Sequence, residues 1–276
     1  MVTKKQIRSG KALKKKSKQR QKFPDLLLQI VSLSDIVLQI LDSRFINQTR
    51  NREIEELISK KKKKILFVLN KSDLIKKSKI KKSTLENIRP YIFTSAIKRS
   101  GGKELRDKVK AFAKKIEPKE KGERISVGVI GYPNTGKSSL INLLIGKTSA
   151  KVGAKAGFTK GIQKLKLSKE IILLDSPGVI PNDKYSTSDP LKMSENAIVG
   201  ARDYSDVKDP EIAIFQLVKL YKKEFEEYYK FEFEDDEDLM EKLGLKQNIL
   251  RKGGKVNTDQ VARRILRDWQ QGKIKI

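Results

Sequence analysis

Residues 125–138 of this 276-residue chain read ISVGVIGYPNTGKS. The first six residues are mostly aliphatic and predict a buried strand. The next eight fit the pattern Gly-x4-Gly-Lys-Ser and lead into a helical stretch from Ser138 to Leu144. A strand before this pattern and a helix after it are the context of a phosphate-binding loop. Its glycines let backbone N–H groups wrap around phosphates, and the helix N-terminus adds positive potential. The stretch therefore predicts a nucleotide site in an α/β fold.

The side chains of this loop have separate expected tasks. Lys137 is expected to reach the β- and γ-phosphates, and the Ser138 hydroxyl is expected to bind Mg²⁺. The candidate nucleotide contacts of the loop as a whole are Asn134, Thr135, Gly136, Lys137, Ser138 and Ser139.

A second phosphate-side motif follows about forty residues later, the spacing that gives an Asp-x-x-Gly pattern weight. The aliphatic run 171–174 delivers Asp175, which can hold Mg²⁺ through water, and the Gly178 N–H can sense the γ-phosphate. Between the motifs, Thr159 is the candidate second Mg²⁺ ligand, although an ordinary loop threonine would look the same. The catalytic candidates are Lys137, Thr159 and Gly178.

A base-reading motif, Asn70-Lys71-Ser72-Asp73, comes directly after the aliphatic run 65–69. The Asp73 carboxylate is an acceptor suited to the N1–H and N2 donors of guanine, a donor pair that adenine lacks. Asn70 is expected at N7 and at the neighbouring loop, with the Lys71 stem over the ring. Thr94-Ser95-Ala96 follows the run 91–93, and the backbone N–H groups of Ser95 and Ala96 are expected at the O6 oxygen.

These motifs stand in an unusual order, because the base-reading half precedes the phosphate-reading half. An ordinary GTPase has the opposite order. The segment after Asp175 is therefore expected to run straight into a C-terminal domain. A movement of this segment that the nucleotide causes would then be passed directly to that domain.

The expected fold is an α/β domain with a mostly parallel, doubly wound sheet, followed by a small all-α C-terminal domain. Strands are expected at 35–41, 65–69, 91–93, 125–130, 162–167 and 171–174, and helices at 47–60, 104–116, 209–229 and from an N-cap at Thr258. Three parts are expected: a basic disordered arm at 1–22, the nucleotide-binding domain at 23–185, and a helical RNA-binding domain at 186–276.

Charge separates this chain from an average protein. Its 62 Lys and Arg against 34 Asp and Glu give a formal net charge of +28. A one-signed excess favours a polyanion such as nucleic acid. Genome composition or heat adaptation would usually add Glu along with Lys. The run Lys60–Lys64 suits either a helix C-terminus or an RNA surface, and the acidic stretch Glu232–Asp238 suits a solvated loop or a helix start.

Absent residue types exclude several chemistries. The chain contains no Cys and no His, so disulfides and Cys/His zinc sites are excluded. No apolar run approaches the roughly 18 residues of a membrane span. A soluble, cytoplasmic and monomeric protein is expected.

With these motifs, the chain resembles the circularly permuted GTPases of ribosome assembly, in particular the ribosome biogenesis GTPase A group and its archaeal and nucleolar relatives. The likeness covers nearly the whole chain. Asp42-Ser43-Arg44 resembles the family's Asp-Ala-Arg element, and Lys252-Gly253-Gly254, Asp259 and Asp268–Ile274 resemble the end of its RNA-binding domain. The resemblance implies GTP or GDP as ligand, Mg²⁺ as cofactor, and ribosomal RNA with the large subunit or its precursor as partner.

Two departures bear on hydrolysis. In related bacterial enzymes an N-terminal histidine is implicated in GTP hydrolysis, and this chain has no histidine. Val179 stands where Ras-like proteins have a glutamine that positions the attacking water. The family shares the apolar residue, so Val179 supports membership, but slow intrinsic turnover is expected. Several relatives use the asparagine of Pro-Asn-x-Gly-Lys-Ser to hold potassium, which makes Asn134 a candidate K⁺ ligand; shaping the loop is its other possible role.

Three functions compete at this point. The leading one is a GTP-switched assembly factor whose basic arm and Arg263/Arg264/Arg267 face contact RNA phosphates. The second is a GTP-gated RNA-binding scaffold with incidental hydrolysis, which the missing His and Gln favour. The third, a tRNA-modification GTPase, is disfavoured by the motif order and by the lack of a C-terminal cysteine.

Overall fold

The protein is described from a computed structural model, which covers residues 26–118, 122–146, 162–175 and 189–276. The expected basic arm at 1–22, Thr159, Gly178, Val179 and the expected domain boundary at 185/186 lie outside these residues.

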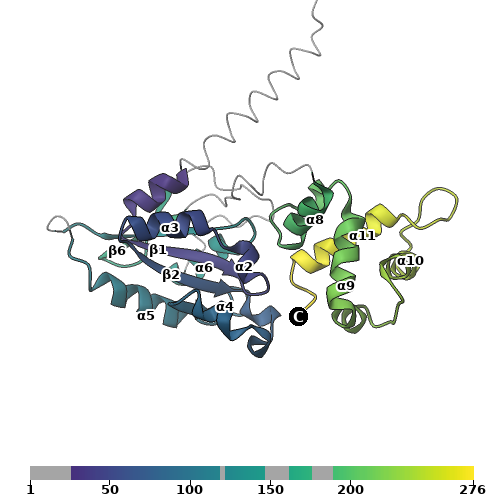
Figure 1. The fold of residues 1–276 in the computed structure, drawn as a ribbon, viewed down its shortest axis with the longest axis horizontal. Coiled ribbons are helices and arrows are strands. Elements are labelled where there is room, and N and C mark those ends of the chain that lie inside the picture. The colour runs from purple at the N-terminus through teal and green to yellow at the C-terminus, as the bar shows by residue number, and fades with distance from the viewer. Residues whose placement is uncertain (1–25, 119–121, 147–161, 176–188) are drawn as a thin grey trace, which may run out of the picture.

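The described residues form a six-stranded sheet in the order β3-β2-β1-β4-β6-β5 (Figure 1). All neighbouring strands run parallel except β5, which is antiparallel to β6. The strands are β1 (Ile36–Asp42), β2 (Lys64–Asn70), β3 (Tyr91–Phe93), β4 (Ile125–Gly131), β5 (Gln163–Lys166) and β6 (Ile171–Asp175). The expected mostly parallel α/β fold is therefore confirmed, and each expected strand is present with only small shifts at its ends.

Helices cover both faces of the sheet, as the continuous burial of β1 requires (Figure 1). α5 (Gly102–Ala113) and α6 (Lys137–Ile145) pack on one face against side chains such as Leu38 and Val127. The helix at 26–33 and α3 (Arg52–Lys60) pack on the other face against Val37 and Ile130. The short elements α2 (Ile46–Thr49), η1 (Ser72–Leu74), η2 (Lys77–Lys79) and α4 (Lys82–Glu86) complete the loops at the carboxyl ends of β1 and β2.

The carboxyl ends of β1, β2 and β4 lie side by side. Asp42 is in register with Asn70, and Ile40 with Gly131. Ligands of open α/β sheets bind beyond this edge of the strands. The base-reading and phosphate-reading motifs therefore meet at one edge, although about sixty residues separate them in sequence.

The C-terminal part is helical, with α8 (Pro190–Ile198), η3 (Tyr204–Asp206), α9 (Pro210–Tyr229), α10 (Asp236–Lys246) and α11 (Thr258–Gln270). The expected apolar stripe of α11 is fully buried, and the ring of Trp269 stacks on Phe225 at 5.8 Å. Phe45 and Tyr132 from the sheet domain belong to the same hydrophobic core. The helices therefore dock against the sheet domain through a shared core.

Three expected helix ends need correction. The predicted helix at 47–60 is broken into α2 and α3, because the Asn51 side chain caps α3 by accepting from the Ile54 N–H. The predicted N-cap Thr258 is the first residue of α11, and Asn257 is the cap. The helix predicted at 104–116 begins at Gly102 and ends at Ala113. The acidic stretch does start a helix, since Asp235 caps α10.

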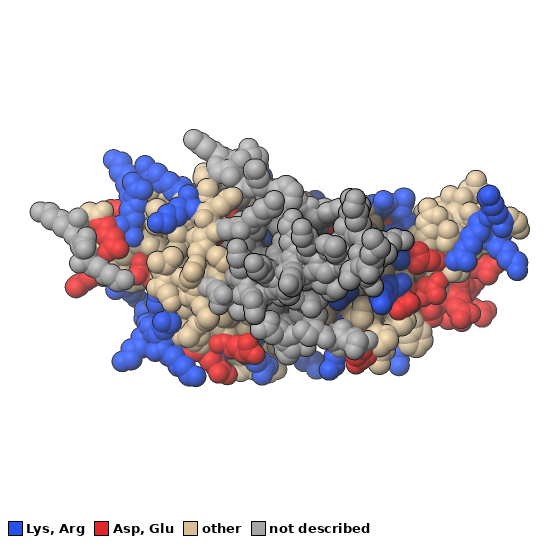
Figure 2. Space-filling model, turned by 90° about the horizontal axis from the view of Figure 1, so that it is seen from above, with Lys and Arg blue, Asp and Glu red and all other residues tan. Residues whose placement is uncertain are grey.

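Charge is unevenly spread over the surface. Figure 2 shows Lys and Arg in several groups at the sheet end, and a cluster of Asp and Glu at the helical end, where α10 has its acidic first turn. Among the described residues, no helix is long and apolar enough to cross a membrane.

Gly244 gives a test of packing in the helical domain. It lies inside α10, where alanine normally favours a helix by up to about 1 kcal/mol. A Cβ at this position would overlap Val256 Cγ1. We expect Gly244→Ala to lower the unfolding free energy by about 1–3 kcal/mol in urea denaturation. In a Val256→Ala background, the same change should be neutral or stabilising. A loss of equal size in both backgrounds would contradict this packing.

Candidate functional site

The phosphate loop connects β4 to α6 at the carboxyl edge of the sheet. Gly136 caps α6 with a φ of 90°, and a Cβ there would overlap the Asn70 Nδ2 atom. Only glycine suits both the left-handed backbone and this close approach. Thr135 Oγ1 donates to the Tyr132 carbonyl at 2.9 Å, which closes the loop. Ser138 and Ser139 lie half-buried in the first turn of α6, at the end where backbone N–H groups lack intrahelical partners.

Lys137 is buried at the centre of the loop. Its Nζ donates to the carbonyls of Gly131 at 3.0 Å and Tyr132 at 2.8 Å. Burial lowers its pKa from 10.5 to about 8, and the nearby charge of Asp175 partly opposes this shift. Asp175 is itself buried at the end of β6, in register with Val129. The structure thus brings together the predicted phosphate lysine and the predicted Mg²⁺ carboxylate.

The base-reading motif begins where β2 ends. Lys71 has a left-handed φ of 59°, and the Ser72 N–H donates to the Thr94 carbonyl at 3.0 Å. The half-buried Asp73 carboxylate makes no hydrogen bond or ion pair with any described residue. The motif therefore turns out of the sheet with one carboxylate available to a ligand.

The Asn70 amide joins three loops. Its Nδ2 donates to the Thr135 carbonyl at 2.8 Å, and its Oδ1 accepts from Ala96 N at 3.2 Å and Thr94 Oγ1 at 3.3 Å. The expected contact of Asn70 with a neighbouring loop is present, and that loop is the phosphate loop. A single buried side chain thus fixes the base-reading motif against the phosphate-reading motif.

The expected donors to the base oxygen are engaged within the protein. The Ser95 N–H donates to the Ser100 carbonyl at 3.1 Å, and the Ala96 N–H donates to Asn70 Oδ1. A base oxygen at this place would have to share the two N–H donors with the Ser100 carbonyl and Asn70 Oδ1, or take the place of these acceptors. The sequence could not have predicted that these donors are already engaged, because every residue except proline has a main-chain N–H and the residue type does not say which acceptor it finds.

A buried ion cluster also belongs to the site. Asp42 accepts from Arg44 Nε at 3.1 Å and Nη2 at 2.9 Å, and forms an ion pair with Lys71 Nζ at 2.9 Å. Burial alone would raise the pKa of Asp42, but the charges of Arg44 and Lys71 hold it well below its usual range. The residue types alone did not assign Asp42 and Arg44 to the nucleotide site. Their position at the carboxyl end of β1, where Asp42 is in register with Asn70, is the signal that could have found them.

The phosphate loop also touches the helical domain. Asn134 has a φ of 57°, and its Nδ2 donates to the Gly200 carbonyl at 2.9 Å. The neighbouring Tyr132 is buried in the core shared by the two domains. One side of Asn134 is therefore used in the contact between the domains, and its Oδ1 is the atom left for a ligand.

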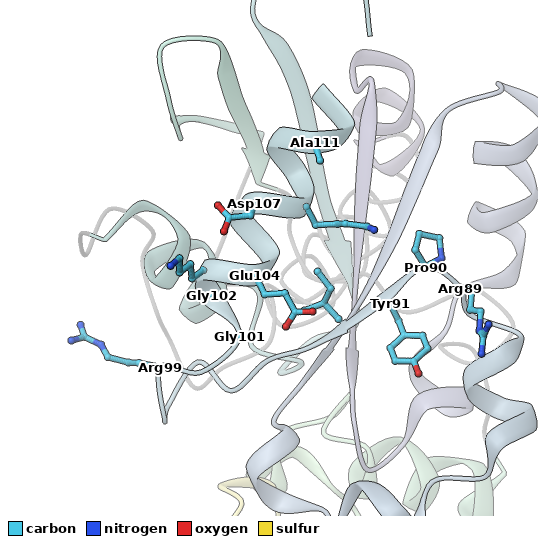
Figure 3. Close-up of a pocket in the computed structure, with 12 residues that line it drawn as sticks. Arg89, Pro90, Tyr91, Arg99, Gly101, Gly102, Glu104, Asp107 and Ala111 are labelled. Carbon is cyan, nitrogen blue, oxygen red and sulfur yellow. The ribbon is translucent and has the colours of Figure 1, made fainter. Parts of the chain in front are cut away.

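A cavity of about 1240 Å³ lies elsewhere, between the edge strand β3 and α5. Figure 3 shows Arg89 and Tyr91 on one side of it and Glu104 and Asp107 on the other. No residue of the phosphate loop lines this cavity. We place the nucleotide site at the carboxyl edge of the sheet, where the motifs converge, and not in this cavity.

Comparison with known proteins agrees with this geometry. Residues 126–239 match the family model of the 50S ribosome-binding GTPase. The chain is 38% identical over 251 residues to "Uncharacterized GTP-binding protein MJ1464" of Methanocaldococcus jannaschii, covering 89% of this chain and 64% of that protein. It is 36% identical over 258 residues to "Nuclear/nucleolar GTPase 2" of Oryza sativa subsp. indica, covering 90% of this chain and 46% of that protein. The chain thus spans about half to two thirds of the length of these relatives.

The fold is shared with a solved structure. The crystal structure of GNP-bound YlqF from T. maritima superposes with a TM-score of 0.62, covering 92% of this chain and 95% of that chain at 22% identity. The expected fold is confirmed by this structure, and the expected resemblance to GTP-binding proteins is confirmed by the sequence matches.

The low pKa of Lys137 makes stability depend on pH. Between its folded value of about 8 and the ordinary 10.5, the unfolded chain binds more protons than the folded one. The unfolding free energy should therefore rise with pH across this window, by at most about 1.4 kcal/mol per pH unit. Chemical denaturation at several pH values, without nucleotide, should show this slope in the wild type and a smaller slope in Lys137→Met. Identical slopes would contradict the assignment.

Proposed function

We propose that the chain is a circularly permuted GTP-binding protein, which binds and hydrolyses GTP and acts in assembly of the large ribosomal subunit. The observation that carries this proposal is the Asn70 amide, which couples a guanine-reading motif to a phosphate loop across the permuted order. The description of the family model, 50S ribosome-binding GTPase, supports the ribosomal role, and the relatives' names support the GTPase activity.

In this proposal the guanine base is read by Asp73, whose carboxylate is open, with Asn70, Lys71, Ser95 and Ala96 around it. The wrong base would leave the Asp73 carboxylate without donors, which is a strong basis for rejection. The phosphates would replace the carbonyls that now hold Lys137, and the loop residues from Asn134 to Ser139 would surround them. A phosphate beside Lys137 favours the protonated amine and so reverses the effect of burial on its pKa.

The residues proposed for Mg²⁺ are Ser138, Asp175 and Thr159, a set of hard oxygen donors of the kind this ion prefers. The buried Asp175 carboxylate beside Lys137 fits such a role. When bound, the ion neutralises phosphate charge during transfer. The chain's own part is to position the nucleotide and to place Lys137 at the phosphates.

The chain has no His at all, so the commonest general-base side chain is not available to activate the attacking water. We propose that intrinsic hydrolysis is slow and that ribosomal particles accelerate it, with Gly178 sensing the γ-phosphate. The protein would then act wherever pre-ribosomal particles are found in its cell, as a monomer.

RNA contacts are proposed mainly for cations that lack acidic partners. Among the described residues, Arg89, Arg99, Lys103 and Lys108 line the β3–α5 cavity and form no ion pair. The arginines of α11 differ from this: Arg263 is held by Asp259 at 2.9 Å and by two η3 carbonyls, and Arg264 lies 3.7 Å from Asp268. The expected phosphate-binding face of α11 is therefore partly occupied by internal contacts.

The alternative is a GTP-gated RNA-binding scaffold in which occupancy matters and turnover does not. The missing His favours it. Turnover in the presence of ribosomal particles separates the two functions.

Co-sedimentation with separated ribosomal subunits tests the proposed function. With a non-hydrolysable GTP analogue, we expect selective binding to large subunits, weaker binding with GDP, and faster GTP hydrolysis in the same tubes. Lys137→Met is the matched control, because it leaves the surface unchanged and removes the phosphate contact. Nucleotide-independent binding to any RNA, without stimulation, would contradict the switch.

Potassium gives a second test, directed at Asn134. With Asn134 Oδ1 as a K⁺ ligand, GTPase rates should be at least about tenfold higher in potassium chloride than in sodium chloride at matched ionic strength. Asn134→Ala should bring the ratio of the two rates to about one. Asn134→Asp keeps an oxygen but loses the donor to Gly200, so it should retain the dependence on potassium. Equal wild-type rates in the two salts would rule out this role.

A further inference from the structure

The guanine-reading loop is anchored through Arg44 to the C-terminal domain. Two guanidinium atoms of Arg44 hold the Asp42 carboxylate, and Nη1 donates to the Trp269 carbonyl at 3.0 Å. The guanidinium also lies over the rings of Phe45 and Trp269, at 5.1 and 5.3 Å. Since Asp42 holds Lys71 as well, one carboxylate connects the base-reading lysine to α11.

A second link lies on the other side of the loop. The Ile276 N–H donates to the Leu74 carbonyl at 2.9 Å, and the Lys76 N–H donates to the Ile276 carbonyl at 3.2 Å. Between these links, Gly272 passes so close to Leu74 that a Cβ would lie 2.6 Å from Leu74 Cδ1. Residues 269–276, which we call the C-terminal strap, therefore hold the loop at 70–76 at both ends.

The loop itself has little internal support. Its regular structure is the short 3₁₀ turn Ser72–Leu74, entered through the left-handed Lys71. Short segments of this kind open locally at low free-energy cost unless other elements hold them. A loop that is already ordered binds its ligand without the entropic cost of becoming ordered.

We propose that the C-terminal strap positions the guanine-reading loop, so that affinity for the guanine base depends on docking of the C-terminal domain. This inference rests on the proposed binding of guanine nucleotide. The strap contacts Arg44, Leu74 and Lys76 on the base side. GDP and a GTP analogue share the same base, so both should depend on the strap to the same degree.

Gly272→Ala tests the strap without changing an expected nucleotide contact. The added methyl would press on Leu74 and strain a backbone with φ of 72°. Gly253→Ala is the matched control, because Gly253 has a φ of 94° but open space around its Cβ position. We expect Gly272→Ala to raise the Kd for GDP and for the analogue by the same factor, about 5- to 150-fold, the usual range for coupling between sites. Gly253→Ala should leave both Kd values at the wild-type level.

A measurement on the wild type covers the case in which Gly272→Ala does not fold. Coupling is reciprocal, so GDP should slow hydrogen exchange in the strap. The Ile276 and Lys76 N–H groups report this directly, and α10 (Asp236–Lys246) is the reference segment that should not change. Unchanged exchange in the strap at saturating GDP would overturn the inference.

These experiments distinguish a failure of nucleotide binding from a failure of the strap to affect it. If the wild type fails to bind GDP, the proposed function fails and the inference falls with it. If the wild type binds and a folded Gly272→Ala binds equally well, only the inference fails. A loss confined to the GTP analogue would also overturn it, because that result places the effect on the phosphate side.

Discussion

The candidate site depends on one buried amide. Asn70 donates to the carbonyl of Thr135 in the phosphate loop and accepts from Thr94 and Ala96 in the second base-side loop. These three loops come from three strands; a main-chain bond from the Ser72 N–H to the Thr94 carbonyl joins the two base-side loops, and the Asn70 amide adds the phosphate loop. A buried amide left unpaired costs about 1–3 kcal/mol, so separating the phosphate loop from Asn70 is opposed by a cost of that size. The close approach that this bond requires also explains why residue 136 is glycine.

The permuted chain order is compatible with this site because of parallel strand geometry. Side chains that come directly after parallel strands meet at one edge whatever the order of the strands in sequence. β4 begins at Ile125, so the chain enters the second half of the domain at the amino ends of the strands, opposite the edge that carries the motifs. Joining the halves there leaves Asn70 and Thr135 in contact. The new order instead changes the connection after β6, since the chain passes from Asp175 to the helical domain.

Much of this could be predicted from the sequence, and the failures share a cause. The aliphatic runs before Asn70, Thr94 and Gly131 fixed the strands, because burial in a parallel sheet demands continuous apolar residues. The base-reading and phosphate-loop patterns were each recognisable as short local stretches, and the structure brings Asn70 and Thr135 into contact. A periodic pattern does not specify the hydrogen-bond partners of individual groups. Three features that depend on such partners were therefore not predicted: the break between α2 and α3, the cap at Asn257, and the hydrogen bond of the Ala96 N–H. The Asp42–Arg44–Lys71 cluster was missed as part of the site because its members come from the carboxyl ends of two different strands and its last partner, Trp269, lies 225 residues away from Arg44.

The two domains touch at both halves of the site, and this limits how a switch can work. Arg44 and Leu74 bind the C-terminal strap on the base side, while Tyr132 and Asn134 contact the helical domain on the phosphate side. A movement driven by the γ-phosphate that shifted the whole helical domain would have to break the Asn134–Gly200 bond or the contacts of the strap. Packed interfaces of this kind change between discrete arrangements and do not deform continuously. If docking of the helical domain tightens guanine nucleotide as proposed, an RNA that binds this domain in its docked arrangement would tighten the nucleotide too, by the same factor with which the nucleotide tightens RNA.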